Sequence, residues 1–122
     1  MTNHEKLVII STIGAENPEK ATLPFVLAGA AQATDVEVVI ILQANAVALG
    51  KIGESEKINA EGFMPLKELI NSYIQLGGNL LICSPCLKVR NIAKEDLING
   101  TSIIAAGTVV TEVLSAKSVV TY

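Results

Sequence analysis

Two cysteines, Cys83 and Cys86, are the residues of this sequence best suited to carry chemistry. They directly follow the apolar run 80–82, which is typical of a buried strand. Pro85, between them, can occupy the first turn of a helix because no N–H donor is needed there. The spacing therefore predicts that both thiols lie at a corner where a strand gives way to a helix.

Positive charge and free backbone amides favour a thiolate at such a corner. The first N–H groups of a helix have no partner within the helix, and its N-terminal end carries partial positive charge. Lys88 and Arg90 add side-chain charge close by. We predict Cys83 as the nucleophile and Cys86, about one helical turn away, as the residue that resolves a disulfide or persulfide on it. Lys88, Arg90 and Ser84 are the candidate binding residues.

Other interpretations of the cysteines remain open. Free cysteines are often small buried hydrophobic residues, so both could be structural. A Cys-x-x-Cys pair is also half of a zinc site, but the sequence contains no second pair, and its one histidine, His4, is expected in a solvated tail. We therefore predict no metal site within one chain, although a partner subunit could supply ligands. A reversible disulfide, as in dithiol oxidoreductases, is a further alternative.

Alternating strands and helices must position this corner. Short apolar runs predict five strands, at 7–12, 36–42, 80–82, 102–106 and 118–121. Helical patterns predict four helices, at 18–34, 66–76, 85–92 and 108–116. The alternation predicts an α/β fold, a flavodoxin-like or Rossmann-like three-layer sandwich with a five-stranded, mostly parallel sheet and the first strand at its centre.

The first helix and the loops around it are predicted to be structural. Asn17 suits the N-cap, and Glu16 and Glu19 are expected to belong to the helix start rather than to catalysis. The residues expected to form its buried face are Leu23, Val26, Leu27, Ala30 and Ala31. Residues 45–61 are predicted to be loops, of which 54–61 could also cover the cysteines at the carboxyl edge of the sheet.

Composition limits the class of protein. A chain of 122 residues predicts one domain, 1–122. Hydrophobic residues form 50% of it and the mean hydropathy is +0.49, yet no apolar run reaches the roughly 18 residues of a membrane span. A parallel sheet buried on both faces, or burial between subunits, explains this excess.

Charge and motifs exclude several ligands. The net charge of −3 argues against nucleic acid as a partner. Residues 14–17 follow the first predicted strand without a glycine-rich phosphate loop, so we expect no nucleotide cofactor, and no other cofactor is predicted. The polar N-terminus lacks the pattern of a signal peptide, which predicts a cytoplasmic protein.

The stretch 82–92 resembles the Cys-x-x-Cys-x-x-x-Arg-Gly-Ile stretch of the DsrE/DsrF-like family, and the likeness extends over nearly the whole chain. The resemblance implies a flavodoxin-like fold, trimers or hexamers, and cytoplasmic sulfur transfer through a cysteine persulfide. In TusD-like members the acceptor cysteine stands at the strand end, where Cys83 lies here. Asn91 replaces the usual glycine, and asparagine tolerates left-handed backbone conformations better than most residues.

The sequence thus predicts a small cytoplasmic sulfur carrier that accepts sulfane sulfur as a persulfide on Cys83 and passes it to a partner protein. Sulfur donor and acceptor proteins are the expected partners, together with further copies of the chain. Two alternatives stay open: a non-catalytic oligomeric binding module with structural or metal-binding thiols, and a Cys-x-x-Cys dithiol oxidoreductase.

Overall fold

A single five-stranded sheet organises the protein, whose computed structural model describes residues 5–122. The strands are β1 (Lys6–Ser11), β2 (Glu37–Leu42), β3 (Asn79–Cys83), β4 (Thr101–Ile104) and β5 (Ser118–Thr121). All pairings between neighbours are parallel, and the order across the sheet is β4-β3-β2-β1-β5. The predicted α/β fold with a five-stranded sheet is therefore confirmed. His4 lies outside the described residues.

The middle of the sheet is β2, so the expectation that the first strand is central was wrong. From β1 to β4 each new strand is added on the same side of the previous one. The chain then returns across the sheet and places β5 on the other side of β1. Sequence order alone does not reveal this reversal, because either direction gives the same alternation of strands and helices.

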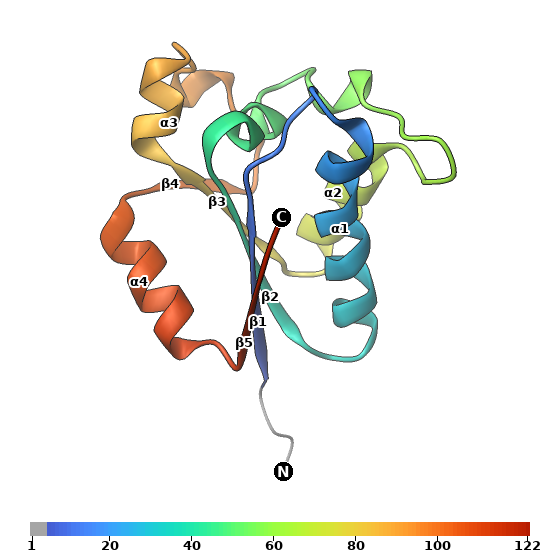
Figure 1. Cartoon of the computed structure of the whole chain (residues 1–122), viewed down its shortest axis with the longest axis vertical. Coiled ribbons are helices and arrows are strands. Elements are labelled where there is room, and N and C mark those ends of the chain that lie inside the picture. The colour runs from blue at the N-terminus through green and yellow to red at the C-terminus, as the bar shows by residue number, and fades with distance from the viewer. Residues whose placement is uncertain (1–4) are drawn as a thin grey trace.

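Helices cover both faces of the sheet. The α-helices are α1 (Pro18–Ala33), α2 (Leu66–Gln75), α3 (Ser84–Val89) and α4 (Ala106–Ser115). Short 3-10 helices are η1 (Ala44–Gly50), η2 (Ser55–Lys57) and η3 (Lys94–Asp96). Figure 1 shows α1 and α2 on one side of the sheet and α4 on the other, which gives three layers. Parallel strands joined through a helix follow right-handed crossovers. The connection through α4 crosses the sheet in the direction opposite to the earlier connections, so a right-handed crossover places α4 on the opposite face.

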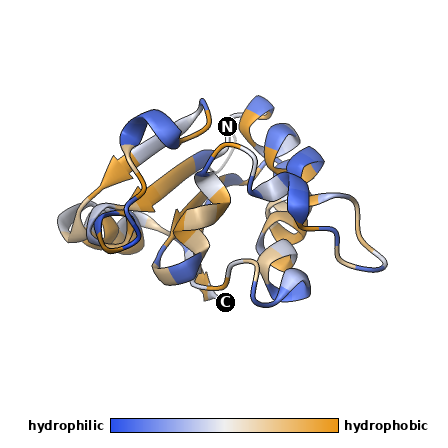
Figure 2. Cartoon of the chain, turned by 90° about the horizontal axis from the view of Figure 1, so that it is seen from above, coloured by the Kyte–Doolittle hydropathy of each residue, from blue (hydrophilic) through white to orange (hydrophobic). Residues whose placement is uncertain are grey.

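The larger core lies between the sheet and the helices α1 and α2. Phe25 of α1 and Tyr73 of α2 are buried there and meet edge to face, with ring centroids 5.9 Å apart. In Figure 2 the strands are largely orange and lie between helices whose blue residues face outward. The Tyr73 hydroxyl accepts a hydrogen bond from the Ile40 amide and reaches the carbonyl oxygens of Val38 and Asn79.

The buried face of α1 differs from the predicted one. Ala21, Phe25 and Ala28 are buried, whereas Val26 is 37% exposed and Ala30 is exposed. Apolar residues occur on most sides of this helix, so their spacing does not identify the face that packs on the sheet. The predicted N-cap is confirmed, since the Asn17 side chain accepts a hydrogen bond from the Lys20 amide at 3.1 Å.

The opposite face of the sheet is covered more sparsely. Its core consists of Val8, Val39, Ile41 and Ile104, with Val109 among the half-buried residues packed against it. In the segment 99–122, Ile104 is the one buried residue. The last fifth of the chain is thus apolar but contributes little to the core of the single chain.

Candidate functional site

The two thiols lie at the carboxyl edge of the sheet, at the corner between β3 and α3. Cys83 is the last residue of β3, Ser84 is the first residue of α3, and Cys86 lies in the first turn of this helix. The Cys83 and Cys86 sulfur atoms are 3.0 Å apart, within hydrogen-bond distance. Both are free, half-buried thiols. The local structure is the predicted one, with Pro85 in the first turn of α3.

The connection after β2 supplies a hydrogen-bond donor to the pair. The Ala44 backbone amide donates to the Cys86 sulfur at 3.3 Å. Ala44 adopts a φ of 51°, a left-handed conformation that is uncommon for a residue with a side chain. Since β2 and β3 are parallel neighbours, their connections meet at the same edge. Segment 44–50, which overlaps the predicted loop 45–61, is the 3-10 helix η1.

A chain of hydrogen bonds links Cys86 to two further loops. The Arg90 guanidinium donates from Nη1 to the Cys86 carbonyl at 3.1 Å and from Nη2 to Asn45 Oδ1 at 2.9 Å. Asn45 Nδ2 donates to Glu16 Oε2 at 3.1 Å, and the Gly14 amide donates to Glu16 Oε1 at 3.0 Å. Arg90 is thereby held beside the cysteines from the loops after β1 and β2.

Glu16 acts as the acceptor at the end of this chain. Burial by itself would raise the pKa of Glu16, but hydrogen bonds from Asn45 and the backbone, together with the Arg90 charge, leave it lowered. Glu16 therefore stays ionised and balances the charge of Arg90.

The surroundings distinguish the two thiols. Burial raises the pKa of Cys83, and the hydrogen bond with Cys86 acts in the same direction. The same hydrogen bond lowers the pKa of Cys86. Burial would raise this pKa, but the Ala44 amide and the Arg90 charge also lower it, and together these contributions outweigh burial. Thiol protons can be placed on either sulfur, so these surroundings decide where the charge resides. When the pair loses one proton, Cys86 becomes the thiolate and Cys83 keeps its hydrogen.

The structure gives the predicted binding residues different positions. Arg90 acts on both thiols through its charge. Lys88 is exposed, and Ser84 is half-buried at the beginning of α3. Asn91 has a φ of 56°, a left-handed conformation that asparagine tolerates better than most residues.

Sequence reasoning missed Ala44, Asn45 and Glu16. Glu16 was assigned to the start of α1, although it binds Asn45 instead. Asn45 carried one usable signal, because it comes shortly after the end of a buried strand and such positions gather at the carboxyl edge of a parallel sheet. The role of Ala44 depends on its backbone conformation, which its residue type does not reveal.

An apolar pocket of about 280 Å³ lies beside Cys83. Its lining residues come from the ends of β2, β3 and β4 and from α3 and α4, and they are Gln43, Cys83, Pro85, Ile104, Ala105, Ala106, Val109 and Val110. Cys86 is not among them. The pair thus presents Cys83 to an accessible pocket, while Cys86 contacts Ala44 and lies beside Arg90.

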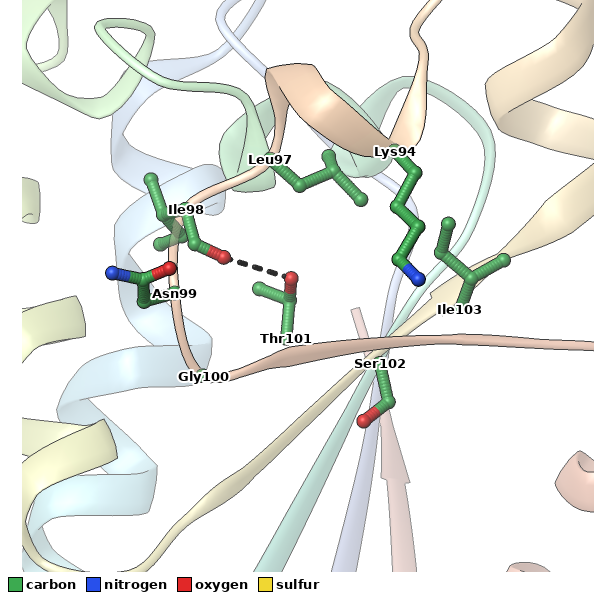
Figure 3. A pocket seen from close by; sticks show the side chains of 8 residues that line it. All are labelled: Lys94, Leu97, Ile98, Asn99, Gly100, Thr101, Ser102 and Ile103. Carbon is green, nitrogen blue, oxygen red and sulfur yellow. Dashed lines mark hydrogen bonds between the residues drawn. The ribbon is translucent and has the colours of Figure 1, made fainter.

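A larger cavity, of about 470 Å³, lies along β4 and includes neither cysteine. Figure 3 shows Lys94 and Ile103 at one end of it, and the Thr101 hydroxyl donating to the Ile98 carbonyl, a hydrogen bond of 2.9 Å. Lys94 is the only charged residue among those that line it. This cavity presents no nucleophile or acid–base pair.

The described residues offer neither a cluster of metal ligands nor a membrane-spanning helix. Within residues 5–122, no group of three or more histidine, cysteine, aspartate or glutamate side chains is placed to hold a metal ion. The same part of the chain contains no helix with the length and apolar character needed to cross a membrane.

Comparison of the sequence with known proteins finds relatives among archaea. The model of the DsrE/DsrF-like family matches residues 5–122. The uncharacterized protein MJ0989 of Methanocaldococcus jannaschii is 29% identical over 117 residues, which is 96% of this chain and 99% of that protein. The uncharacterized protein MK0008 of Methanopyrus kandleri is 28% identical, with 98% of each chain covered. MJ0760 of M. jannaschii is 28% identical over 88% of this chain, which spans only 39% of that protein.

Solved structures share the fold. The ychN protein from E. coli superposes with a TM-score of 0.75 at 16% identity, covering 98% of this chain and all of that one. Protein MTH1491 from Methanobacterium thermoautotrophicum superposes with a TM-score of 0.76 at 11% identity, again over 98% of this chain.

Proposed function

Because this chain belongs to the DsrE/DsrF-like family, which is associated with sulfur relay, we propose that it is a small cytoplasmic sulfur carrier. It accepts sulfane sulfur on Cys83 as a persulfide and passes the sulfur to a partner protein. The observation that carries this proposal is the pairing of two unequal thiols 3.0 Å apart, of which Cys83 faces an accessible pocket. Free thiols of this kind persist in a reducing compartment such as the cytoplasm.

Cys86 supports the loading step as a base. Its thiolate lies within reach of the Cys83 proton and accepts it as the Cys83 sulfur attacks the outer sulfur of a donor persulfide, R–S–SH. The donor's S–S bond breaks, a new S–S bond forms on Cys83, and R–SH leaves with the proton that Cys86 received. The products are Cys83–S–SH and R–SH, so the step involves no net oxidation.

Unloading can follow two routes. A thiolate of the acceptor attacks the outer sulfur of the persulfide, and Cys83 leaves as a thiolate that regains a proton. Alternatively, the Cys86 thiolate attacks the inner sulfur, which forms a Cys83–Cys86 disulfide and releases hydrosulfide. The second route needs a dithiol reductant to regenerate the pair by reducing the disulfide with two electrons.

Intact-protein mass spectrometry after exposure to n-propyl hydropersulfide tests the loading step. We expect a gain of about 32 Da per sulfur atom, reversed by a reducing thiol and assigned to Cys83 by fragmentation of the peptide that carries both cysteines. Cys83→Ser should abolish the gain. Cys86→Ser should keep much of it but load more slowly at neutral pH, because Cys83 then lacks its base.

Two results would contradict the proposal. Equal loading in Cys83→Ser would place the sulfur elsewhere. Thiols that resist both the persulfide donor and alkylating reagents in the folded protein would favour a structural role and a non-catalytic binding module.

The short distance between the sulfurs also favours a second candidate function, a dithiol oxidoreductase. Reduction of a model disulfide, coupled to formation of the Cys83–Cys86 disulfide and dependent on both thiols, would support it. Persulfide transfer to an acceptor thiol without any disulfide intermediate would exclude it.

Self-association completes the proposal. Apolar side chains remain exposed on the α4 side of the sheet, namely Leu114 of α4 at 80% and Val119 of β5 at 37%. Large apolar side chains exposed together on one face mark contact sites between proteins. We therefore propose that this face packs against further copies of the chain in a trimer or hexamer.

A further inference from the structure

We propose that the apolar pocket beside Cys83 binds the uncharged organic group of a small persulfide, so that the sulfur donor is an apolar organic persulfide rather than an inorganic anion such as thiosulfate. This inference rests on the proposed function, because it names the substrate class of the same thiol.

The walls of the pocket contain no charged side chain. Five of its eight lining residues are alanine, valine or isoleucine, Pro85 is a sixth apolar residue, and the remaining two are Gln43 and Cys83 itself. A dianion placed here would lose its water without gaining a cationic partner. An apolar group would instead be removed from water at no electrostatic cost.

The positive charge of the site lies on the other side of the cysteine pair. Arg90 is engaged with the Cys86 carbonyl and with Asn45, and it lines a separate, shallow pocket with Glu16, Lys51 and Glu54. The Cys83 sulfur is therefore approached through apolar walls, and the guanidinium stabilises Cys86 rather than a bound anion.

The size of the pocket suits a small organic group. An apolar cavity of about 150 Å³ is enough to hold benzene, and this one measures about 280 Å³. The beginning of α4 at Ala106 forms part of the wall and adds the weak positive potential of a helix N-terminus. That potential suits the single negative charge of a persulfide on Cys83 after transfer.

The transfer is balanced as written above. The donor R–S–SH gives its outer sulfur to Cys83, its S–S bond is replaced by the S–S bond of Cys83–S–SH, and R–SH is released. The apolar group R stays in the pocket during the exchange and holds the outer sulfur against the Cys83 sulfur.

Two donors of similar length, whose organic groups differ in charge, test this inference. n-Propyl hydropersulfide and 2-carboxyethyl hydropersulfide are compared at equal concentration, with loading of Cys83 followed by mass spectrometry. We expect the propyl donor to load Cys83 at least about tenfold faster, because its competitor must desolvate a carboxylate. Equal rates would overturn the inference.

A matched pair of variants locates the effect. Val110→Lys places a cation in the pocket wall and should lower the propyl-to-carboxyethyl rate ratio at least about tenfold. Thr111→Lys introduces the same charge at the next position of α4, on an exposed side chain outside the pocket, and should leave the ratio unchanged. Because both donors react with the same folded molecules, the propyl-to-carboxyethyl rate ratio does not depend on the fraction of protein that is folded. The same loss of preference in both variants would overturn the inference, because the effect would then not come from the pocket wall.

Binding can also be measured without chemistry. In Cys83→Ser, the unreactive dipropyl sulfide should shift the methyl NMR signals of Val109 and Val110 with saturation, and 3-(methylthio)propanoate should not. No shift with dipropyl sulfide would overturn the inference. Saturable binding in this variant, combined with no sulfur on Cys83 from any donor in the unaltered protein, would instead contradict the proposed function and leave the pocket's preference standing.

Discussion

The Cys83 and Cys86 sulfurs share a hydrogen bond and therefore titrate as a pair. The first proton lost leaves the charge on Cys86, because the Ala44 amide and Arg90 lie on its side. The thiol that reacts first with a small electrophile is therefore not the thiol that a sulfur donor can reach through the pocket. Cys86 holds the charge, whereas Cys83 lines the pocket.

This division predicts the order of alkylation. Since the pKa of Cys86 is lowered and that of Cys83 raised, Cys86 has the larger thiolate fraction at neutral pH and should react first with iodoacetamide. Cys83 should follow only as the pH rises above the usual range for a thiol. Fragmentation mass spectrometry of the peptide that carries both cysteines, taken from partly alkylated protein over a pH series, measures both profiles.

Arg90 provides the control for this prediction. Arg90→Gln removes a positive charge beside Cys86, so the pKa of Cys86 rises and its alkylation at neutral pH slows several-fold. Lys88→Gln removes the same charge from an exposed position on α3 and should leave the rate unchanged. Faster reaction of Cys83 than of Cys86 at neutral pH would contradict the assignment of charge.

At the residue scale, the sequence predicts what is local. The Cys-x-x-Cys spacing, the proline between the thiols and the nearby arginine are contiguous, so their joint position follows from one strand-to-helix corner. The partners Glu16, Ala44 and Asn45 come from separate connections, and their convergence depends on which strands are neighbours. No pattern along the chain encodes that neighbourhood.

At the scale of the elements, Tyr73 ties α2 to the sheet. Its buried hydroxyl accepts from the Ile40 amide and reaches backbone carbonyls of both β2 and β3. Tyr73→Phe keeps the ring contact with Phe25 but leaves the Ile40 amide without this acceptor. We expect a loss of about 1–3 kcal/mol in the free energy of unfolding, measured by urea denaturation.

Tyr122 offers the matched substitution. Tyr122→Phe removes the same hydroxyl from a half-buried ring, so its free energy of unfolding should change by less than about 0.5 kcal/mol. A loss in Tyr73→Phe as small as in Tyr122→Phe would show that the buried hydroxyl does not support the sheet.

A helix can be predicted in detail where its apolar residues lie on one face and its polar residues on the other. The helix at 66–76 was predicted because polar and apolar residues alternate with helical periodicity, and α2 (Leu66–Gln75) confirms it. The buried face of α1 was missed because that helix is apolar on most sides. Segment 44–50 lacks any clear period, yet Ala46, Val47 and Leu49 are buried in η1, since a short 3-10 helix can bury apolar residues without an amphipathic repeat.

At the scale of the whole molecule, the two faces of the sheet are covered unequally. The face under α1 and α2 holds most of the core, whereas α4 covers the other face alone and leaves Val110 and Leu114 exposed. The composition showed an excess of apolar residues but not which surface exposes them. That surface depends on how the chain crosses the sheet through α4 to reach β5.

This surface predicts a response to a single charge. Leu114→Glu should weaken self-association by at least about 2 kcal/mol, or roughly 30-fold in the dissociation constant, because a buried carboxylate would lack a partner. Sedimentation over a range of concentrations measures the change.

Leu76→Glu is the control for association. Leu76 is 64% exposed but follows α2, on the other side of the sheet, and the substitution should leave the mass in solution unchanged. If Leu114→Glu sediments as the unaltered protein does, the α4 face is not the contact between copies.

The pairing of β5 with β1 also orders events during synthesis. The outer edge of β1 gains its partner only when residues 118–121 have left the ribosome, since Leu7 pairs with Ser118 and Thr12 contacts Tyr122 across 110 positions. Until then the nascent chain carries a long apolar strand with one open edge, the kind of edge that recruits strands from other chains. Closing so distant a contact is slow relative to forming the local crossovers from β1 to β4. The growing polypeptide is therefore most prone to aggregate just before its last strand emerges.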